Sequence, residues 1–270
     1  MEKNTVKFAT QSSQKRLKSM LKVDFRRTLT TPLYYIMVGI AFVMPILILV
    51  MTGMMDGTTS TDPVTGDITV MQGFENVWQA IATPSSANAA MSMDLVSMCN
   101  INLLYFMVAV FVCLFVAEDF RSGYAKNLFT VRPKKNDYVV SKTIVGFFGG
   151  VSMIIAYFIG AMIGGGIVGL SFDLGTAGVG GLVMCMLSKI FVMAIFVSIC
   201  LAMSVFAKQR SWLSIICSFG ASMLLFAMIP MMTPLDANIL NFIICLAGGL
   251  MFSVGLGYLS NVILKKNNIL

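Results

Sequence analysis

The feature that most constrains this chain is a series of six apolar stretches, each long enough to cross a lipid bilayer as a helix. A helix rises about 1.5 Å per residue, so about 20 apolar residues cover the hydrocarbon core of about 30 Å. Strands of a membrane barrel would be about half as long and would alternate in polarity. We therefore expect an all-α polytopic membrane protein with six transmembrane helices. They are predicted at residues 33–55, 99–117, 143–170, 182–207, 211–232 and 241–264.

The composition excludes an ordinary water-soluble enzyme. Of the 270 residues, 57% are hydrophobic and 11% are charged, whereas about a quarter of the residues of soluble domains are charged. Histidine is absent, which removes histidine metal sites and histidine general bases. The six cysteines form no CxxC pair and lie in or beside apolar stretches, so we interpret them as small buried apolar residues.

Lysine and arginine are segregated between alternate connections. Apart from Lys189, they lie before the first stretch, within 118–142, at 208–210 or after the sixth stretch. The connections 56–98, 171–181 and 233–240 contain acids but no Lys or Arg. Since basic loops stay in the cytoplasm, both termini are predicted to be cytoplasmic. The net charge of +7 then reflects membrane topology, and the bilayer rather than a nucleic acid is the expected partner.

This topology gives two regions: a cytoplasmic tail with an interfacial helix at 1–32, and a six-span transmembrane domain at 33–270. Residues 13–31 carry apolar side chains near one helical face and basic side chains largely elsewhere, which is typical of a helix lying on anionic headgroups. A basic, unstructured tail is the alternative. The expected apolar face is Leu17, Met20, Leu21, Phe25 and Leu29.

The outer loop 56–98 begins with residues typical of turns, up to Asp67. Its second part carries apolar residues at roughly helical intervals and predicts short amphipathic helices at the membrane surface, broken at Pro84. These residues are Phe74, Val77, Trp78, Ile81, Met91 and Leu95. Glycines four apart, such as Gly160 and Gly164, predict close packing between helices.

The cytoplasmic loop 118–142 predicts a short helix over 118–131. Its acids come first and its bases later, which suits the helix dipole, and Pro133 ends it. Phe120, Tyr124, Leu128 and Phe129 form an apolar face. Because so short a helix gains little stability alone, we expect it to dock on another surface. A solvated loop that only carries topogenic charge is the alternative.

The stretch Glu118–Asn127, which reads E-D-F-R-S-G-Y-A-K-N, together with Tyr138–Lys142, resembles the first cytoplasmic loop of type-2 ABC exporter permeases. The segment Leu21–Arg27 before Thr31-Pro32-Leu33 is similar to the connecting helix of that family. The resemblance implies a coupling helix that inserts into a separate ATPase subunit. The implied coupling residues are Glu118, Asp119, Phe120, Arg121, Gly123, Tyr124, Lys126 and Asn127, and the implied interfacial-helix residues are Lys22, Phe25, Arg26 and Arg27.

The same resemblance implies the partners. Two copies of an ATP-binding cassette subunit would bind ATP and Mg, a second identical or homologous permease would complete the pathway, and this chain would hold no cofactor. The long outer loop resembles the bacitracin and antimicrobial-peptide resistance branch, which implies a bacterial plasma membrane. The short connection 233–240 departs from members of the family that have a large outer domain there.

Two other transport mechanisms are weighed. An ion-coupled carrier usually holds carboxylates at mid-membrane, and no Asp or Glu lies inside a predicted span. Lys189 is the one clear charge there, either facing an anionic substrate or snorkelling outward. A copper exporter could use methionine thioethers, although apolar filling explains these residues more simply. The candidate clusters are Met51, Met54 and Met55, and Met228, Met231 and Met232.

Catalysis by the chain itself is not expected. It has no GxSxG motif, and the Walker A pattern GxxxxGK[ST] is absent, so the chain cannot hydrolyse ATP by that route. We therefore expect a permease subunit that exports an amphipathic or hydrophobic compound, such as a peptide, drug or lipid-like molecule, by means of a separate ATPase.

Overall fold

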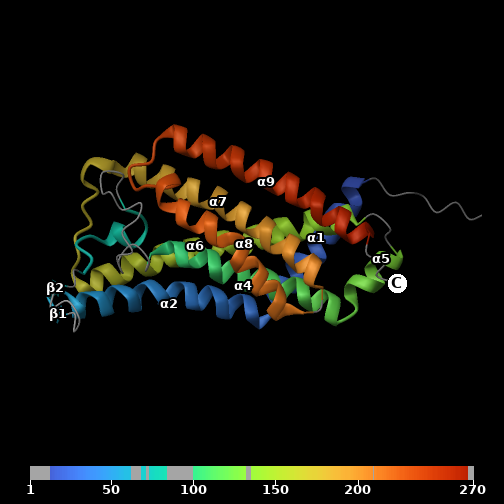
Figure 1. Ribbon diagram of the computed structural model, residues 1–270, viewed down its shortest axis with the longest axis horizontal. Coiled ribbons are helices and arrows are strands. Elements are labelled where there is room, and N and C mark those ends of the chain that lie inside the picture. Colours follow the sequence, from blue (N-terminus) through green and yellow to red (C-terminus); the bar gives the residue numbers. More distant parts are fainter. Residues whose placement is uncertain are drawn as a thin grey trace, which may run out of the picture.

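The computed structural model describes residues 13–61, 68–70, 73–83, 100–131, 135–208 and 210–266, and these form an elongated bundle of helices (Figure 1). The long helices are α1 (Ser13–Thr30), α2 (Pro32–Met55), α4 (Leu104–Arg121), α6 (Asn136–Val168), α7 (Gly178–Ala207), α8 (Ser211–Met232) and α9 (Ile239–Lys266). The short elements are α5 (Tyr124–Val131), the 3-10 turns η1 (Val77–Ala80), η2 (Ile101–Leu103) and η3 (Gly175–Ala177), and the antiparallel strands β1 (Thr59–Thr61) and β2 (Ile68–Val70).

The candidate membrane spans confirm the predicted all-α polytopic fold. Within the described ranges, α2, α4 with η2, α6, α7 and α9 are each long and apolar enough to cross a bilayer. The predicted fifth span differs from a straight helix, because α8 bends by 49° between Ser211–Met223 and Leu225–Met232. Counting the two segments of α8 as one span gives six.

The helices differ greatly in how much of their surface the fold buries. In the most apolar window of α7, 72% of the residues are buried, against 22% for α2 and 11% for α9. In Figure 1, α2 and α9 lie along opposite sides of the bundle, with α4, α7 and α8 between them. Because a bilayer solvates apolar side chains, the exposed faces of α2 and α9 are those expected of helices in lipid.

The predicted close packing of small residues is confirmed between α2 and α6. A Cβ atom on Gly160 would clash with the backbone carbonyl oxygen of Phe42, and one on Gly164 would lie 2.9 Å from the Cα atom of Ile46. The two backbones therefore approach as closely as glycine allows. Gly165 instead makes room for a side chain, because a Cβ atom there would clash with the side chain of Val77 in η1.

The end of the bundle that carries β1, β2 and η1 is tied to the α6–α7 connection. The indole Nε1 of Trp78 donates to the carbonyl of Phe172 at 2.9 Å, and the backbone N–H of Val77 donates to Ser171. The side chain of Asn76 also donates to the carbonyl of Asp173. The described part of this loop contains a strand pair and a 3-10 turn, where the sequence predicted turns and short amphipathic helices. The predictions at Pro84, Met91 and Leu95 lie outside the described residues.

The opposite end carries α1, α5 and the α7–α8 turn, and we call it the basic end. There α4 continues to Arg121 and α6 begins at Asn136, so both helices extend into the segment interpreted as a loop. Glu118, Asp119 and Asp137 therefore lie within helices, which corrects the expectation that the spanning helices carry no acids. The start of α1 and the end of α9 both lie at this end, because Arg16 pairs with Asp137 and Lys135 donates to Leu264.

Candidate functional site

The helix α1 lies along the first half of α6 and buries a stripe that is apolar at Met20 and polar at Asp24 and Thr28. Met20, Asp24 and Thr28, four residues apart, are each at most 3% exposed. Lys22 and Arg26 are exposed, and Phe25 and Arg27 are partly buried. The predicted helix is present; Met20 of its predicted apolar face is buried and Leu29 is exposed, and contact of this face with the membrane stays a prediction.

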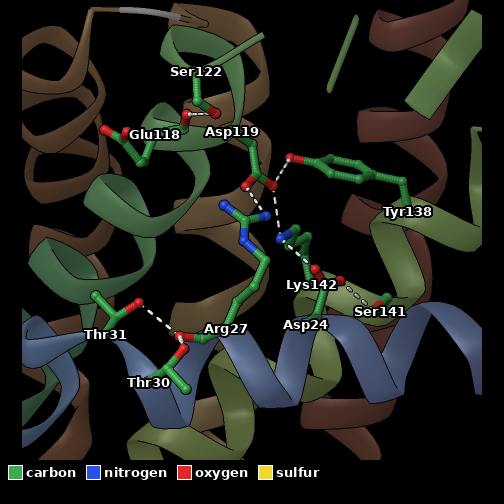
Figure 2. Close-up of polar contacts among 10 residues, drawn as sticks. All are labelled: Asp24, Arg27, Thr30, Thr31, Glu118, Asp119, Ser122, Tyr138, Ser141 and Lys142. Atoms are coloured by element: carbon green, nitrogen blue, oxygen red, sulfur yellow. Dashed lines mark hydrogen bonds and ion pairs between the residues drawn. The ribbon is translucent and has the colours of Figure 1, made fainter. Parts of the chain in front are cut away.

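Lys142 of α6 is the centre of a buried charge network that joins α1 to α4 (Figure 2). Its Nζ lies 2.9 Å from Oδ1 of Asp24 and 2.7 Å from Oδ2 of Asp119, and none of these three side chains is exposed. The ammonium also lies 4.1 Å from the centre of the Phe115 ring. One lysine on α6 therefore holds two carboxylates from helices that are far apart in the sequence.

The rest of the network satisfies the remaining carboxylate oxygens. Nη1 of Arg27 donates to Oδ1 of Asp119 at 2.7 Å, and the hydroxyl of Tyr138 donates to Oδ2 of Asp119 at 3.0 Å. The hydroxyl of Ser141 donates to Oδ2 of Asp24 at 2.6 Å. Figure 2 shows these groups converging on the space between the three helices.

The network is electrically balanced, with two carboxylates facing one ammonium and one guanidinium. Removing a charge from water costs several kcal/mol per ion, and only close, well-satisfied partners offset that cost. A buried network of this kind is stable in one arrangement and costly when any member is lost. It therefore fixes how α1, α4 and α6 meet.

The predicted helix over 118–131 is broken in the structure. α4 ends at Arg121, and Gly123 has φ of 73°, a left-handed conformation that favours glycine. α5 then starts at Tyr124 as a separate helix of eight residues. The sharp turn at Gly123 places α5 beyond the end of the bundle (Figure 1).

The eight residues implied by the family resemblance fall into distinct environments. Asp119 and Phe120 are buried, and Gly123 and Tyr124 are partly buried. Four side chains remain on the surface of the basic end, namely Glu118, Arg121, Lys126 and Asn127.

Two aromatic contacts link α5 to the charge network. The guanidinium of Arg27 lies 4.3 Å from the centre of the Tyr124 ring. The ring of Phe129 meets Tyr138 edge-on, with centres 5.3 Å apart. Tyr124 therefore connects α5 to α1, and Phe129 connects it to α6.

The surrounding charges favour the protonation states of Arg27 and Tyr124 in which the two side chains attract each other. Burial lowers the pKa of Arg27, but the charge and hydrogen bond of Asp119, together with the charge of Asp24, outweigh burial and raise the pKa above its ordinary value. Burial raises the pKa of Tyr124, and the charges of Asp24 and Asp119 raise it further. The guanidinium stays charged and the phenol stays neutral, as a cation–π contact requires.

Lys189 is a second buried lysine, and it does not snorkel. It is 1% exposed. Its Nζ donates to Oδ1 of Asn102 at 3.0 Å and to Oγ1 of Thr233 at 2.9 Å. It therefore joins η2, α7 and the end of α8 through neutral oxygens.

The methionine clusters weighed for copper lie mostly on the surface of the bundle. Met51, Met54 and Met55 are between 37% and 78% exposed, and Met228 and Met231 are more than half exposed. Met232 is partly buried. Side chains on an outer helix face do not converge on one point, so their position favours contact with lipid.

Sequence reasoning assigned no role to four members of the network. These are Asp24, Tyr138, Ser141 and Lys142. A signal was available for two of them: Asp24 is an acid within a basic helix and lies four residues after the apolar Met20, and Lys142 adjoins a long apolar stretch. Which acid pairs with which base depends on how α1 folds back along α6. The spacing of residues in the sequence does not predict this arrangement.

Comparison with known proteins supports the resemblance seen in the loop. Neither the curated proteins nor the solved structures give a match to the chain. The family model described as "ABC-2 family transporter protein" matches residues 21–224, which include α1 from Leu21, the charge network and α5. With most of its length matched, the chain belongs to the ABC-2 transporter family.

Proposed function

We propose that this chain is the membrane-spanning permease subunit of an ATP-driven exporter and that α5 receives the movement of a separate ATPase. Members of the family are membrane transport components and are generally not catalytic themselves. The ATPase, in two copies, supplies the ATP and Mg site. A second permease, identical or homologous, completes the pathway, and the basic end faces the cytoplasm.

The observation that carries this proposal is the attachment of α5. Its Tyr124 packs on Arg27, and Arg27 is held by Asp119, which Lys142 links to Asp24. The network is buried, charged and close-packed, so a movement of one of its side chains displaces the others as well. A force applied to α5 would move α1 and the ends of α4 and α6 together.

The exposed groups of α5 and the end of α4 suit a docking surface. Arg121, Lys126 and Asn127 are exposed, which leaves them available to a partner. Glu118 is also exposed, on the last turns of α4. In this mechanism ATP binding draws two ATPase subunits together, α5 follows, and the bundle alternates between inward-open and outward-open states.

The proposed cargo is an amphipathic or hydrophobic compound, and an antimicrobial peptide fits the resistance branch that the outer loop resembles. Support comes from the bundle itself, which offers apolar helix faces rich in methionine and no carboxylate at mid-membrane among its described residues. Methionine surfaces adapt to varied apolar ligands.

The test separates transmission from folding. Tyr124→Leu removes the ring over Arg27 but keeps an apolar side chain, and we expect cargo-stimulated ATP turnover of the assembled transporter to fall by about two- to thirtyfold. Tyr258→Leu, at a tyrosine that is 70% exposed on α9, is the matched control. Equal turnover in both variants would contradict the proposal. Transport driven by an ion gradient in liposomes without any ATPase would instead favour the carrier alternative.

A further inference from the structure

A cavity of about 500 Å³ opens at the basic end between the α4–α5 break and the α7–α8 turn. Four of its lining residues are cations: Arg121 at the end of α4, Lys126 on α5, and Lys208 and Arg210 on the turn. This cavity is separate from the charge network, because none of Asp24, Arg27, Asp119 and Lys142 lines it. We call it the cationic pocket.

The cationic pocket lacks counter-charges among the described residues. The described ion pairs of the basic end engage Arg16, Arg27 and Lys142, and none includes a cation of the pocket. Two acids precede Arg121 closely in the sequence: Asp119 is paired with Arg27 and Lys142, and Glu118 lines a neighbouring cavity and not this one. Four like charges around so small a volume repel one another, so an anion inside it would be attracted by all four.

The start of α8 adds to this attraction. The helix begins at Ser211, directly after the pocket residue Arg210, and no side chain caps its first turn. The N–H groups of that turn and the positive end of the helix dipole favour a phosphate or another anion.

The flanking residues place the pocket at the depth of lipid headgroups. It lies where the candidate spans α4 and α7 end and where α8 begins. Phe206 and Trp212, on either side of the α7–α8 turn, are each 62% exposed. Exposed aromatic residues at span ends are typical of the membrane–water boundary.

A second cavity supplies apolar walls beside the cationic one. It measures about 430 Å³ and Arg121 lines both cavities. Its apolar wall is formed by Leu33, Leu114, Phe115 and Ala117, and its polar side by Arg27, Thr31, Glu118 and Ser211. The cationic cavity on one side of Arg121 and the apolar wall on the other match a molecule with a phosphate head and an acyl tail. An acidic protein surface would use the cationic cavity but not the apolar wall.

We infer that the cationic pocket binds the phosphate of an anionic phospholipid, with the glycerol and the start of the acyl chains extending past Arg121. Basic pockets between helices at the cytoplasmic membrane surface suit such headgroups. The shared chemistry is a phosphate monoester or diester, so a soluble phosphate compound is the competing source of the same group.

The experiment titrates the purified full-length chain with phosphatidylglycerol, phosphatidylcholine and glycerol 3-phosphate and counts bound molecules by native mass spectrometry. The expected result is that phosphatidylglycerol binds about tenfold or more tightly than phosphatidylcholine. Lys208→Gln with Arg210→Gln should weaken phosphatidylglycerol by about ten- to thirtyfold. Lys265→Gln with Lys266→Gln removes the same charge from exposed positions of α9 and should leave binding unchanged.

Several results would overturn this inference. The inference fails if the unaltered chain binds phosphatidylglycerol and phosphatidylcholine equally well. This measurement does not depend on any variant folding. Competition by glycerol 3-phosphate at the concentration of the lipid would assign the pocket to a soluble phosphate. Unchanged lipid binding in the Lys208 and Arg210 variant, with loss of a co-purifying ATPase, would assign it to an acidic protein surface. Neither substituted residue belongs to the Tyr124–Arg27 attachment, so failure here leaves the proposed function standing.

Discussion

Two lysines are buried in this bundle, and their surroundings differ. Lys142 lies between two carboxylates, Asp24 and Asp119, and beneath the ring of Phe115. Lys189 is equally buried but is held by the neutral oxygens of Asn102 and Thr233. The charge of Lys142 is needed by its two carboxylates, whereas Asn102 and Thr233 are neutral acceptors that do not depend on a positive charge at Lys189. Lys142 therefore acts as a structural ion, whereas Lys189 makes a polar contact between helices.

The largest effect is expected at Lys142. Lys142→Met leaves Asp24 and Asp119 close together without the ammonium between them, and we expect the free energy of unfolding to fall by about 3–5 kcal/mol. Denaturant unfolding in detergent micelles measures this. Lys22→Met, at an exposed position of α1, is the control and should have little effect.

A combined variant sharpens the interpretation of that loss. Adding Asp24→Asn to Lys142→Met removes the carboxylate that loses its cation, while Asp119 keeps its ion pair with Arg27, so part of the stability should return. If the double variant is less stable than Lys142→Met alone, uncompensated charge is not the cause of the loss.

An intermediate effect is expected from a pair of tyrosines, one in each region. The hydroxyl of Tyr138 donates to the carboxylate of Asp119, and that of Tyr105 donates to the backbone carbonyl of Lys189 at 3.1 Å. Hydrogen bonds to charged groups contribute about 1.5–3 kcal/mol and neutral ones about 0.5–1.5 kcal/mol. Tyr138→Phe should therefore destabilise the protein more than Tyr105→Phe, measured by the same unfolding assay. The reverse order would remove the distinction between the two regions.

The smallest effect is expected at Lys189. Lys189→Met removes a desolvated charge and leaves one unsatisfied acceptor on Asn102, while Thr233 still donates to Ile229. These contributions oppose each other, so the free energy of unfolding should change by no more than about 1 kcal/mol. A loss as large as that of Lys142→Met would indicate a buried counter-charge that the comparison omits.

The fold was largely predictable from the sequence, because long apolar stretches have few solutions in a bilayer. The prediction failed where helices run past the apolar stretch. Asp119 and Asp137 are polar residues that continue a helix by packing against charged partners, and a hydropathy window ends before them. The bend of α8 was also missed, because its sequence is apolar on both sides of the break.

The resemblance singled out part of the candidate site, whereas the buried network was not predicted. The motif on α5 and the end of α4 singled out Tyr124, which contacts Arg27, and Arg121, whose coupling role stays a prediction. The interaction of Asp24 with Lys142 joins residues 118 positions apart, and it exists only because α1 turns back along α6. Contacts of that range are set by tertiary packing, which local sequence patterns do not encode.

The glycine contact between α2 and α6 limits which parts of the bundle can separate. At Gly160 and Gly164 the backbones of α2 and α6 approach each other directly, which leaves little room for the two helices to slide. We therefore expect any opening of a transport path to keep α2 and α6 together, with α1 attached through Lys142. Other pairs of helices would then have to separate, and the bent α8, which packs on α7 and α4, belongs to two such pairs.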